Sequence, residues 1–381
     1  MTKFQFFCYF VFISCCVISG CNNSRRSGEV QIVESELPSV EVRMLTPLEE
    51  GEVTFSEKDF GKIIELTGQT HELNELFTVS SSEMVIKGNM LFLNNRLPNG
   101  DNISVYRLPE FEFIRSIART GRGPGEFKYI HIFKAESDSI YIYLYEMMGD
   151  KLFYVNKNLE IKEILSQSRS SSSTSFSLKE YQTLYDSVFV YVNSTSTGKA
   201  IFKQIIHKDT ISDVQIYNLA FSTRYKGWAS YTGDFGVNAM DSRMVYAYKY
   251  FKRLLFVDTK TGKMRNLIFN EKDVEIKDNI GTLGPDNVTY YWGMSVNNDY
   301  VYSLYSGRTP IKVKSENDRG IHYIFVEQYD WNGNPIRKFK LDNWGYFCVD
   351  EERGKIYLLS TTAEHPLVIY DLPPLSLLLY N

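Results

Sequence analysis

The chain has 381 residues, of which 43% are hydrophobic and 15% aromatic, and its formal net charge is −4 at pH 7. This charge excludes a general nucleic-acid-binding protein, which would carry a basic patch. Aromatic side chains suit half-buried strands, and the chain contains 27 Tyr and 25 Phe. The composition therefore predicts an all-β fold.

Residues 1–20 are typical of a secretory signal peptide, because Lys3 precedes an apolar stretch from Phe4 to Ile18. The sequence Ile18-Ser19-Gly20-Cys21 resembles the lipobox of bacterial lipoproteins. The resemblance implies cleavage before Cys21 and acylation of its thiol. A transmembrane anchor is the alternative, but about 15 apolar residues fall short of the roughly 20 that span a bilayer core. We therefore expect attachment to the membrane through lipid alone.

Residues 21–52 are mostly polar or charged, which predicts a flexible tether between the lipid and a folded domain over residues 53–381. Cys348 is the single cysteine that follows Cys21, so the mature chain can form no internal disulfide. Its neighbours form an apolar strand pattern. This pattern favours a buried structural thiol over a nucleophile.

An apolar-aromatic pair recurs along the domain at intervals of 48 to 57 residues. The pairs are Leu91-Phe92, Ile140-Tyr141, Val188-Phe189, Val245-Tyr246, Val301-Tyr302 and Ile356-Tyr357. Most follow a polar turn and precede a further apolar strand, as in successive hairpins. Four antiparallel strands per roughly 50 residues form one blade of a β-propeller. The sequence therefore predicts a six-bladed β-propeller, with a β-sandwich plus a second domain as the alternative.

The sixth predicted blade ends after three strands. The segment 62–66, which lies ahead of the first complete blade, has the apolar pattern of a strand. We expect this N-terminal segment to supply the missing outer strand and close the ring, because closure removes an exposed sheet edge.

The most distinctive local motif is the glycine-rich run from Arg119 to Phe127. Its alternating glycines are Gly121, Gly123 and Gly125. A strand pattern follows the run, whereas a phosphate-binding loop leads into a helix. The run therefore predicts a tight crossover between blades, in which glycine supplies positive φ. Arg119 and Arg122 keep anion binding open as an alternative.

The segment from Gly121 to Phe127 resembles the crossover of NHL-type propellers. Together with Tyr291-Trp292-Gly293 and the segment from Tyr302 to Arg308, it resembles the TolB-like six-bladed propeller lipoproteins of Bacteroidetes, over residues 60–373. The resemblance implies a six-bladed propeller on a lipid anchor, without a settled biochemical role.

Surface-exported lipoproteins of that group resemble one another in an acidic run directly after the acylated cysteine. In this chain, residues 22–26 read Asn-Asn-Ser-Arg-Arg instead. We therefore expect an outer-membrane lipoprotein that faces the periplasm, with exposure at the cell surface as the alternative.

No local motif indicates catalysis. The five histidines are dispersed, and the chain contains no HExxH, HxH or CxxC spacing and no GxSxG elbow. We therefore assign no catalytic residue, metal or cofactor. An active site assembled around a propeller channel leaves no local signature, so a lyase or hydrolase acting on saccharides stays open as an alternative.

Long loops on a rigid propeller are usual places for binding, and the sequence offers a Ser-rich stretch over 166–175 and a charged insertion over 311–321. Trp292 and Trp344 each precede a glycine at the start of an inner strand, where they either seal a blade junction or face a ligand. The candidate binding residues are Arg119, Arg122, Glu126, His131, Trp292, Arg308 and Trp344. We expect a non-catalytic propeller that docks a protein partner in the cell envelope; the alternative is a glycan-binding or glycan-cleaving protein.

Overall fold

The structure is a computed structural model that describes residues 45–73, 83–95, 100–166, 179–185, 187–207, 210–225, 227–270 and 286–375. The chain divides into Met1–Met44 and a compact unit, Leu45–Asn381. The predicted signal peptide, Cys21 and most of the predicted tether lie outside the described residues, as does nearly all of the Ser-rich stretch.

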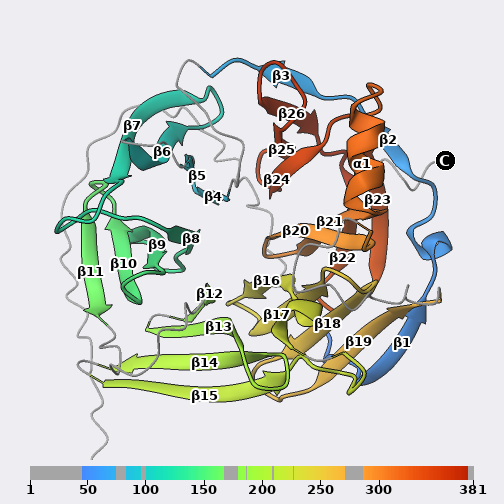
Figure 1. Ribbon diagram of the computed structural model, residues 1–381, viewed down its shortest axis with the longest axis horizontal. Coiled ribbons are helices and arrows are strands. Elements are labelled where there is room, and N and C mark those ends of the chain that lie inside the picture. The colour runs from blue at the N-terminus through green and yellow to red at the C-terminus, as the bar shows by residue number, and fades with distance from the viewer. Residues whose placement is uncertain are drawn as a thin grey trace, which may run out of the picture. The chain divides into compact units, whose positions relative to one another are not determined.

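The compact unit consists of six antiparallel sheets, which are arranged around a common centre (Figure 1). Blade 1 contains β4 (Met84–Lys87), β5 (Met90–Asn94), β6 (Asp101–Arg107) and β7 (Glu112–Arg119). Blade 2 contains β8 (Ile130–Lys134), β9 (Ile140–Glu146), β10 (Lys151–Asn156) and β11 (Ile161–Ser166). Blade 3 contains β12 (Glu180–Tyr185), β13 (Val188–Ser194), β14 (Lys199–His207) and β15 (Thr210–Asn218).

The other three blades follow the same plan. Blade 4 contains β16 (Gly233–Asn238), β17 (Arg243–Tyr248), β18 (Arg253–Asp258) and β19 (Met264–Phe269). Blade 5 contains β20 (Thr289–Val296), β21 (Tyr300–Arg308), β22 (Ile324–Asp330) and β23 (Pro335–Leu341). Blade 6 contains β24 (Gly345–Asp350), β25 (Lys355–Ser360) and β26 (Leu367–Asp371). The innermost strands β4, β8, β12, β16, β20 and β24 each contact the next, and β24 contacts β4, so the ring is closed.

These sheets confirm the predicted six-bladed β-propeller. Each apolar-aromatic pair of the sequence lies in the second strand of its blade, for example Leu91-Phe92 in β5 and Val301-Tyr302 in β21. Such a strand has a neighbour on both edges and a blade against both faces, so most of its successive side chains are buried. Phe92 and Val301 are 0% exposed. A continuous apolar run is the sequence pattern of a strand buried on both faces.

The N-terminal part of the compact unit runs along the outer edges of three blades. β1 (Gly51–Phe55) pairs parallel with β19, and β2 (Ile64–Leu66) pairs parallel with β23. β3 (Gln69–His71) pairs antiparallel with β26 and completes blade 6, so an N-terminal strand closes the ring as predicted. The closing strand is not the expected segment 62–66, of which Ile64 and Leu66 instead pack against the core between blades 5 and 6.

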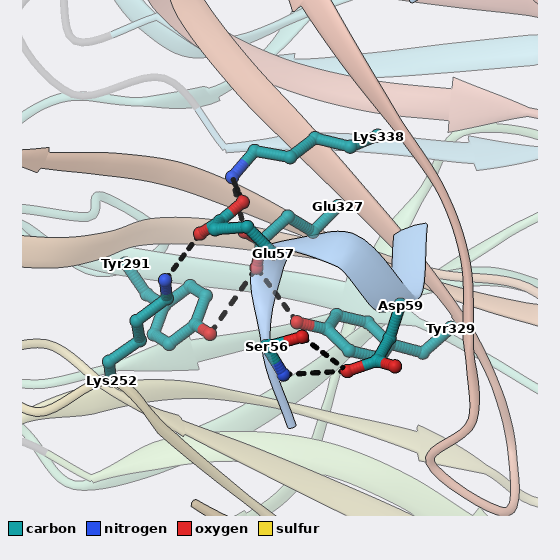
Figure 2. A network of polar contacts seen from close by, with 8 residues as sticks. All are labelled: Ser56, Glu57, Asp59, Lys252, Tyr291, Glu327, Tyr329 and Lys338. Atoms are coloured by element: carbon teal, nitrogen blue, oxygen red, sulfur yellow. Dashed lines mark hydrogen bonds and ion pairs between the residues drawn. The ribbon is translucent and has the colours of Figure 1, made fainter. Parts of the chain in front are cut away.

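A network of polar contacts fastens this N-terminal segment to the ring (Figure 2). The short helix η1 (Glu57–Phe60) places the carboxylate of Glu57 between blades 4 and 5. It accepts hydrogen bonds from Lys252, which follows β17, and from Lys338 of β23 at 2.7 Å. Burial alone would raise the pKa of Glu57, but the positive charges of Lys338 and Lys252 outweigh burial and lower it.

The network continues into the core of blade 5. Lys338 also donates to Glu327 at 2.8 Å, and the side chain of Glu327 is 0% exposed. The hydroxyl groups of Tyr291 and Tyr329 donate to its second oxygen, at 3.3 and 2.7 Å (Figure 2). Every charge in this cluster therefore has a partner of opposite sign or a hydrogen-bond donor, as a buried ion pair requires.

The charged insertion expected over 311–321 contains a helix, α1 (Pro310–Asn317). The side chain of Thr309 accepts a hydrogen bond from the backbone N–H of Lys312 at 3.2 Å, and Pro310 occupies the first helical turn. These are standard signals for a helix start. No helix among the described residues is long and apolar enough to cross a membrane.

Candidate functional site

We call the face at which the innermost strands begin the upper face. Because the strands of each blade are antiparallel, the connection between the second and third strands also lies on this face. α1 is this connection in blade 5, and Thr361 lies in the same connection of blade 6. The insertion in blade 5 therefore stands beside a loop of its neighbour.

A pocket of about 370 Å³, which we call the tryptophan pocket, opens between α1 and blade 6. The helix contributes Pro310, Val313, Lys314 and Asn317, followed by Asp318. Their spacing places them on one face of the helix. The opposite wall consists of Trp292, Trp344, Thr361 and Thr362. The pocket thus joins aromatic surface to hydroxyl, amide and charged groups.

Trp292 and Trp344 pack edge to face, with ring centroids 5.6 Å apart and an interplanar angle of 83°. Trp292 belongs to β20 and Trp344 directly precedes β24, so the rings meet at the junction of blades 5 and 6. Both also line the tryptophan pocket. The two roles considered for them from the sequence are therefore compatible in one arrangement.

Arg308 lies behind the pocket wall and is 6% exposed. Its guanidinium donates to Glu316 of α1 and to the backbone oxygen of Tyr323, both at 2.6 Å. The guanidinium carbon also lies 5.4 Å from the ring centroid of Trp344. Arg308 therefore holds α1 and Trp344 in place.

A second cavity, of about 360 Å³, occupies the central channel and is lined by residues of all six innermost strands. Trp292 lines this cavity as well as the tryptophan pocket, so the two spaces adjoin at its side chain. The charged lining residues near the upper ends of the strands are Glu83, His131, Glu180 and Asp234.

His131 and Glu83 form an ion pair in the channel wall, with Nδ1 and Oε1 2.7 Å apart. The other ring nitrogen of His131 lies 2.9 Å from the backbone oxygen of Tyr181. Burial lowers the pKa of His131, but the neighbouring Glu83 carboxylate outweighs burial and raises it to about 9. The charged imidazolium therefore joins blades 1, 2 and 3 through hydrogen bonds.

Asp234 is the second residue of β16. Burial and the nearby Glu180 carboxylate raise its pKa to about 6. Glu180 itself forms an ion pair with Lys199 at 3.3 Å. The ammonium of Lys249 lies 4.6 Å from the ring centroid of Trp292, and burial lowers its pKa. Glu180 at the upper end of the channel therefore has a direct partner, whereas Asp234 is attracted by Lys249 from a greater distance.

The glycine-rich run forms the crossover from β7 to β8, on the upper face. The carboxylate of Glu126 folds back and accepts from the backbone N–H of Gly123 at 2.8 Å. Gly125 adopts φ +75°, and a Cβ on Gly121 would lie 1.9 Å from the Glu126 carboxylate. A Cβ on Gly123 would meet the same carboxylate at 3.1 Å, and that residue has no positive φ.

The candidate binding residues from the sequence thus fall into three places. Trp292, Trp344 and Arg308 come together at the tryptophan pocket. His131 lies in the channel wall. Arg119, Arg122 and Glu126 lie on the crossover between blades 1 and 2, where Arg122 is exposed and Arg119 lies 3.8 Å from Glu126.

The sequence pointed to the insertion 311–321 as a place for binding, but it did not single out Asp234, Lys249 or Thr361. The expectation that a Trp-Gly step begins an inner strand holds for Trp344-Gly345, but Trp292-Gly293 lies within β20. Gly233 begins β16 as Gly345 begins β24, and this signal could have drawn attention to Asp234. Among the described residues, no group of three or more His, Cys, Asp or Glu is placed to hold a metal ion.

A family model for TolB-like six-bladed propellers matches residues 59–352. The chain belongs to this family. No curated protein matches it.

Solved structures share the fold at low sequence identity. A member of the DUF4221 family from Bacteroides vulgatus is 13% identical, with a TM-score of 0.57 over 81% of this chain and 98% of the other. A predicted exported protein of Bacteroides fragilis is 14% identical, with a TM-score of 0.49 over 84% of this chain and 97% of the other. At 13% identity the likeness to the Bacteroides vulgatus protein shows the propeller fold alone.

Proposed function

We propose that the chain is a lipid-anchored, non-catalytic binding propeller of the cell envelope, and that its tryptophan pocket docks a partner protein. The observation that carries this proposal is the pocket between α1 and the edge-to-face pair of Trp292 and Trp344. Tryptophans in well-packed pockets are the residues on which protein interfaces most often depend. Ile311 and Ile321, which are 52% and 44% exposed, add apolar surface on and beside the helix.

The anchor is proposed from the N-terminal sequence. The resemblance of residues 18–21 to a lipobox supports acylation of Cys21. The absence of acidic residues from positions 22–26 supports an outer-membrane location that faces the periplasm. Acyl chains contribute about 0.8 kcal/mol per buried CH₂, so several chains on one cysteine hold a protein permanently.

The pairing of the channel residues supports a binding role over a catalytic one. His131, the one histidine among the lining residues, is engaged by Glu83 and by the backbone of Tyr181. Its pKa of about 9 keeps it protonated at neutral pH, which removes its value as a general base.

A second candidate function uses the same pocket. Tryptophan faces stack on sugar rings, and the hydroxyls of Thr361 and Thr362 and the amide of Asn317 are suited to bind sugar hydroxyls. We therefore keep saccharide recognition as the alternative ligand class for the tryptophan pocket.

The test compares two charge reversals on α1. Lys314 lines the pocket, whereas Lys312 is exposed on the same helix and does not line it. The lipoprotein is crosslinked in cells and purified, and the proteins attached to it are quantified by mass spectrometry. We expect one protein near stoichiometry, greatly reduced by Lys314→Glu and unchanged by Lys312→Glu.

Equal recovery of the partner with both variants would contradict docking at the pocket. The lipoprotein could instead purify without a partner, while a saccharide changes the tryptophan fluorescence of the wild type but not that of Lys314→Glu. That result would support saccharide recognition at the pocket in place of protein docking.

A further inference from the structure

A second site lies in the central channel, apart from the docking function of the tryptophan pocket. We propose that the upper end of the channel binds a small molecule through a positively charged ammonium group, with the carboxylate of Asp234 as its counter-ion. The cavity there measures about 360 Å³, within the range of small-molecule sites.

The ion pairs in the channel wall leave the carboxylate of Asp234 without a direct partner. Glu83 is neutralised by His131 at 2.7 Å, and Glu180 by Lys199 at 3.3 Å. The carboxylate of Asp234 has no hydrogen bond and no ion pair within 4.0 Å among the described residues. The ammonium of Lys249 attracts it from a greater distance. Asp234 is partly exposed to the cavity, so a cation that enters can reach its carboxylate and be stabilised there.

Aromatic rings line the same cavity. Trp292, Phe235 and Tyr346 are among its lining residues. Burial raises the pKa of Tyr346, and the nearby carboxylate of Asp234 raises it further. The face of Trp292 already accommodates one ammonium, that of Lys249, at 4.6 Å. Carboxylate and aromatic groups together are the usual surroundings of a bound ammonium.

The pH dependence of such binding follows from the groups that face Asp234. These are Glu180 of β12, Lys199 of β14, Lys249 after β17 and Tyr346 of β24. Burial and Glu180 raise the pKa of Asp234 to about 6. Asp234 is therefore almost fully ionised at pH 7.5 and about one-tenth ionised at pH 5, so the affinity for an ammonium should fall about tenfold.

The probe pair is 5-amino-1-pentanol and 1,5-pentanediol, which differ by one ammonium in place of one hydroxyl. Binding to the full-length protein in detergent is followed by saturation-transfer NMR at pH 7.5 and pH 5. We expect binding of the amine and not of the diol, and a drop of about tenfold at pH 5. Asp234→Asn should abolish binding.

The matched control is Asp138→Asn, the same chemical change at an exposed residue between β8 and β9, on the opposite face, which does not line the cavity. It should leave binding of the amine unchanged. The proposal is overturned if the amine does not bind, if the diol binds equally well, or if Asp234→Asn binds the amine as the wild type does. A circular dichroism melt of Asp234→Asn verifies that the variant is folded.

Discussion

The buried ion pair between Lys338 and Glu327 makes a quantitative prediction for stability. Lys338 is 3% exposed and Glu327 is 0% exposed, and the two groups lie 2.8 Å apart. Lys338→Met removes the positive charge and keeps the aliphatic volume. Glu327 is then left buried with only the hydroxyl donors of Tyr291 and Tyr329 (Figure 2). Removing one partner of a buried pair costs about 3–5 kcal/mol.

The expected change in melting temperature follows from the size of the compact unit. Unfolding entropy is about 2.1 cal/mol/K per residue, so about 330 residues give roughly 0.7 kcal/mol/K. A loss of about 3–5 kcal/mol therefore corresponds to a fall of about 4–7 °C in Tm. The double variant Lys338→Met/Glu327→Gln should recover part of this loss, because it removes the unpaired charge.

Scanning calorimetry measures the three proteins beside a control on the same strand. Lys340 pairs with Glu65 at 2.9 Å, but both side chains are exposed, by 38% and 75%. Exposed pairs contribute about 0–1 kcal/mol, so Lys340→Met should lower Tm by no more than about 1–2 °C. The reasoning is refuted if Lys338→Met lowers Tm no further than Lys340→Met does.

Three further predictions concern separate parts of the chain. Gly125→Val should lower Tm clearly more than Gly123→Val, because Gly125 has a positive φ and Gly123 does not. A positive φ costs a branched residue about 1–2 kcal/mol, and equal Tm values for the two variants would contradict this prediction. The raised pKa of His131, about 9 against an ordinary 6.5, means that its ion pair stabilises the fold fully below pH 6.5 and is lost as pH rises through 9. The Tm of the wild type should therefore fall more between pH 7 and pH 10 than that of His131→Gln, and parallel curves would exclude the ion pair as a source of stability. Cys21→Ser should abolish incorporation of an alkyne-labelled fatty acid and release the protein from the membrane fraction; continued labelling would show that another residue carries the lipid.

The six blades were predictable because the strand that identifies each one is buried on both faces. Most of its side chains are apolar, although Asn94 of β5 and Ser303 of β21 are buried polar exceptions, so the apolar-aromatic pair within it recurs in the sequence with the period of the blade. The sequence correctly predicted that an N-terminal strand closes the ring, but it placed this strand a few residues too early. The polar β3, Gln69–His71, closes blade 6 through backbone hydrogen bonds, whereas Ile64 and Leu66 carry the apolar pattern and pack beside blade 5.

The candidate sites were less predictable for a physical reason. Trp292 and Trp344 stand out in the sequence, but their contact depends on how two blades pack, and α1 completes the pocket from an insertion with a polar, charged sequence. Each innermost strand contributes only a few residues to the channel. Asp234 and Glu180 approach one another only when blades 3 and 4 pack together, and no local spacing records that approach.

Position-specific photocrosslinking in cells tests the docking claim most directly. A crosslinking amino acid replaces Thr361, which is exposed and lines the tryptophan pocket, or Met240, which is 73% exposed in the turn between β16 and β17 on the opposite face. The account predicts one defined protein adduct from position 361 and none from position 240. Adducts of the same protein from both positions, or an adduct from position 240 alone, would contradict docking at the upper face.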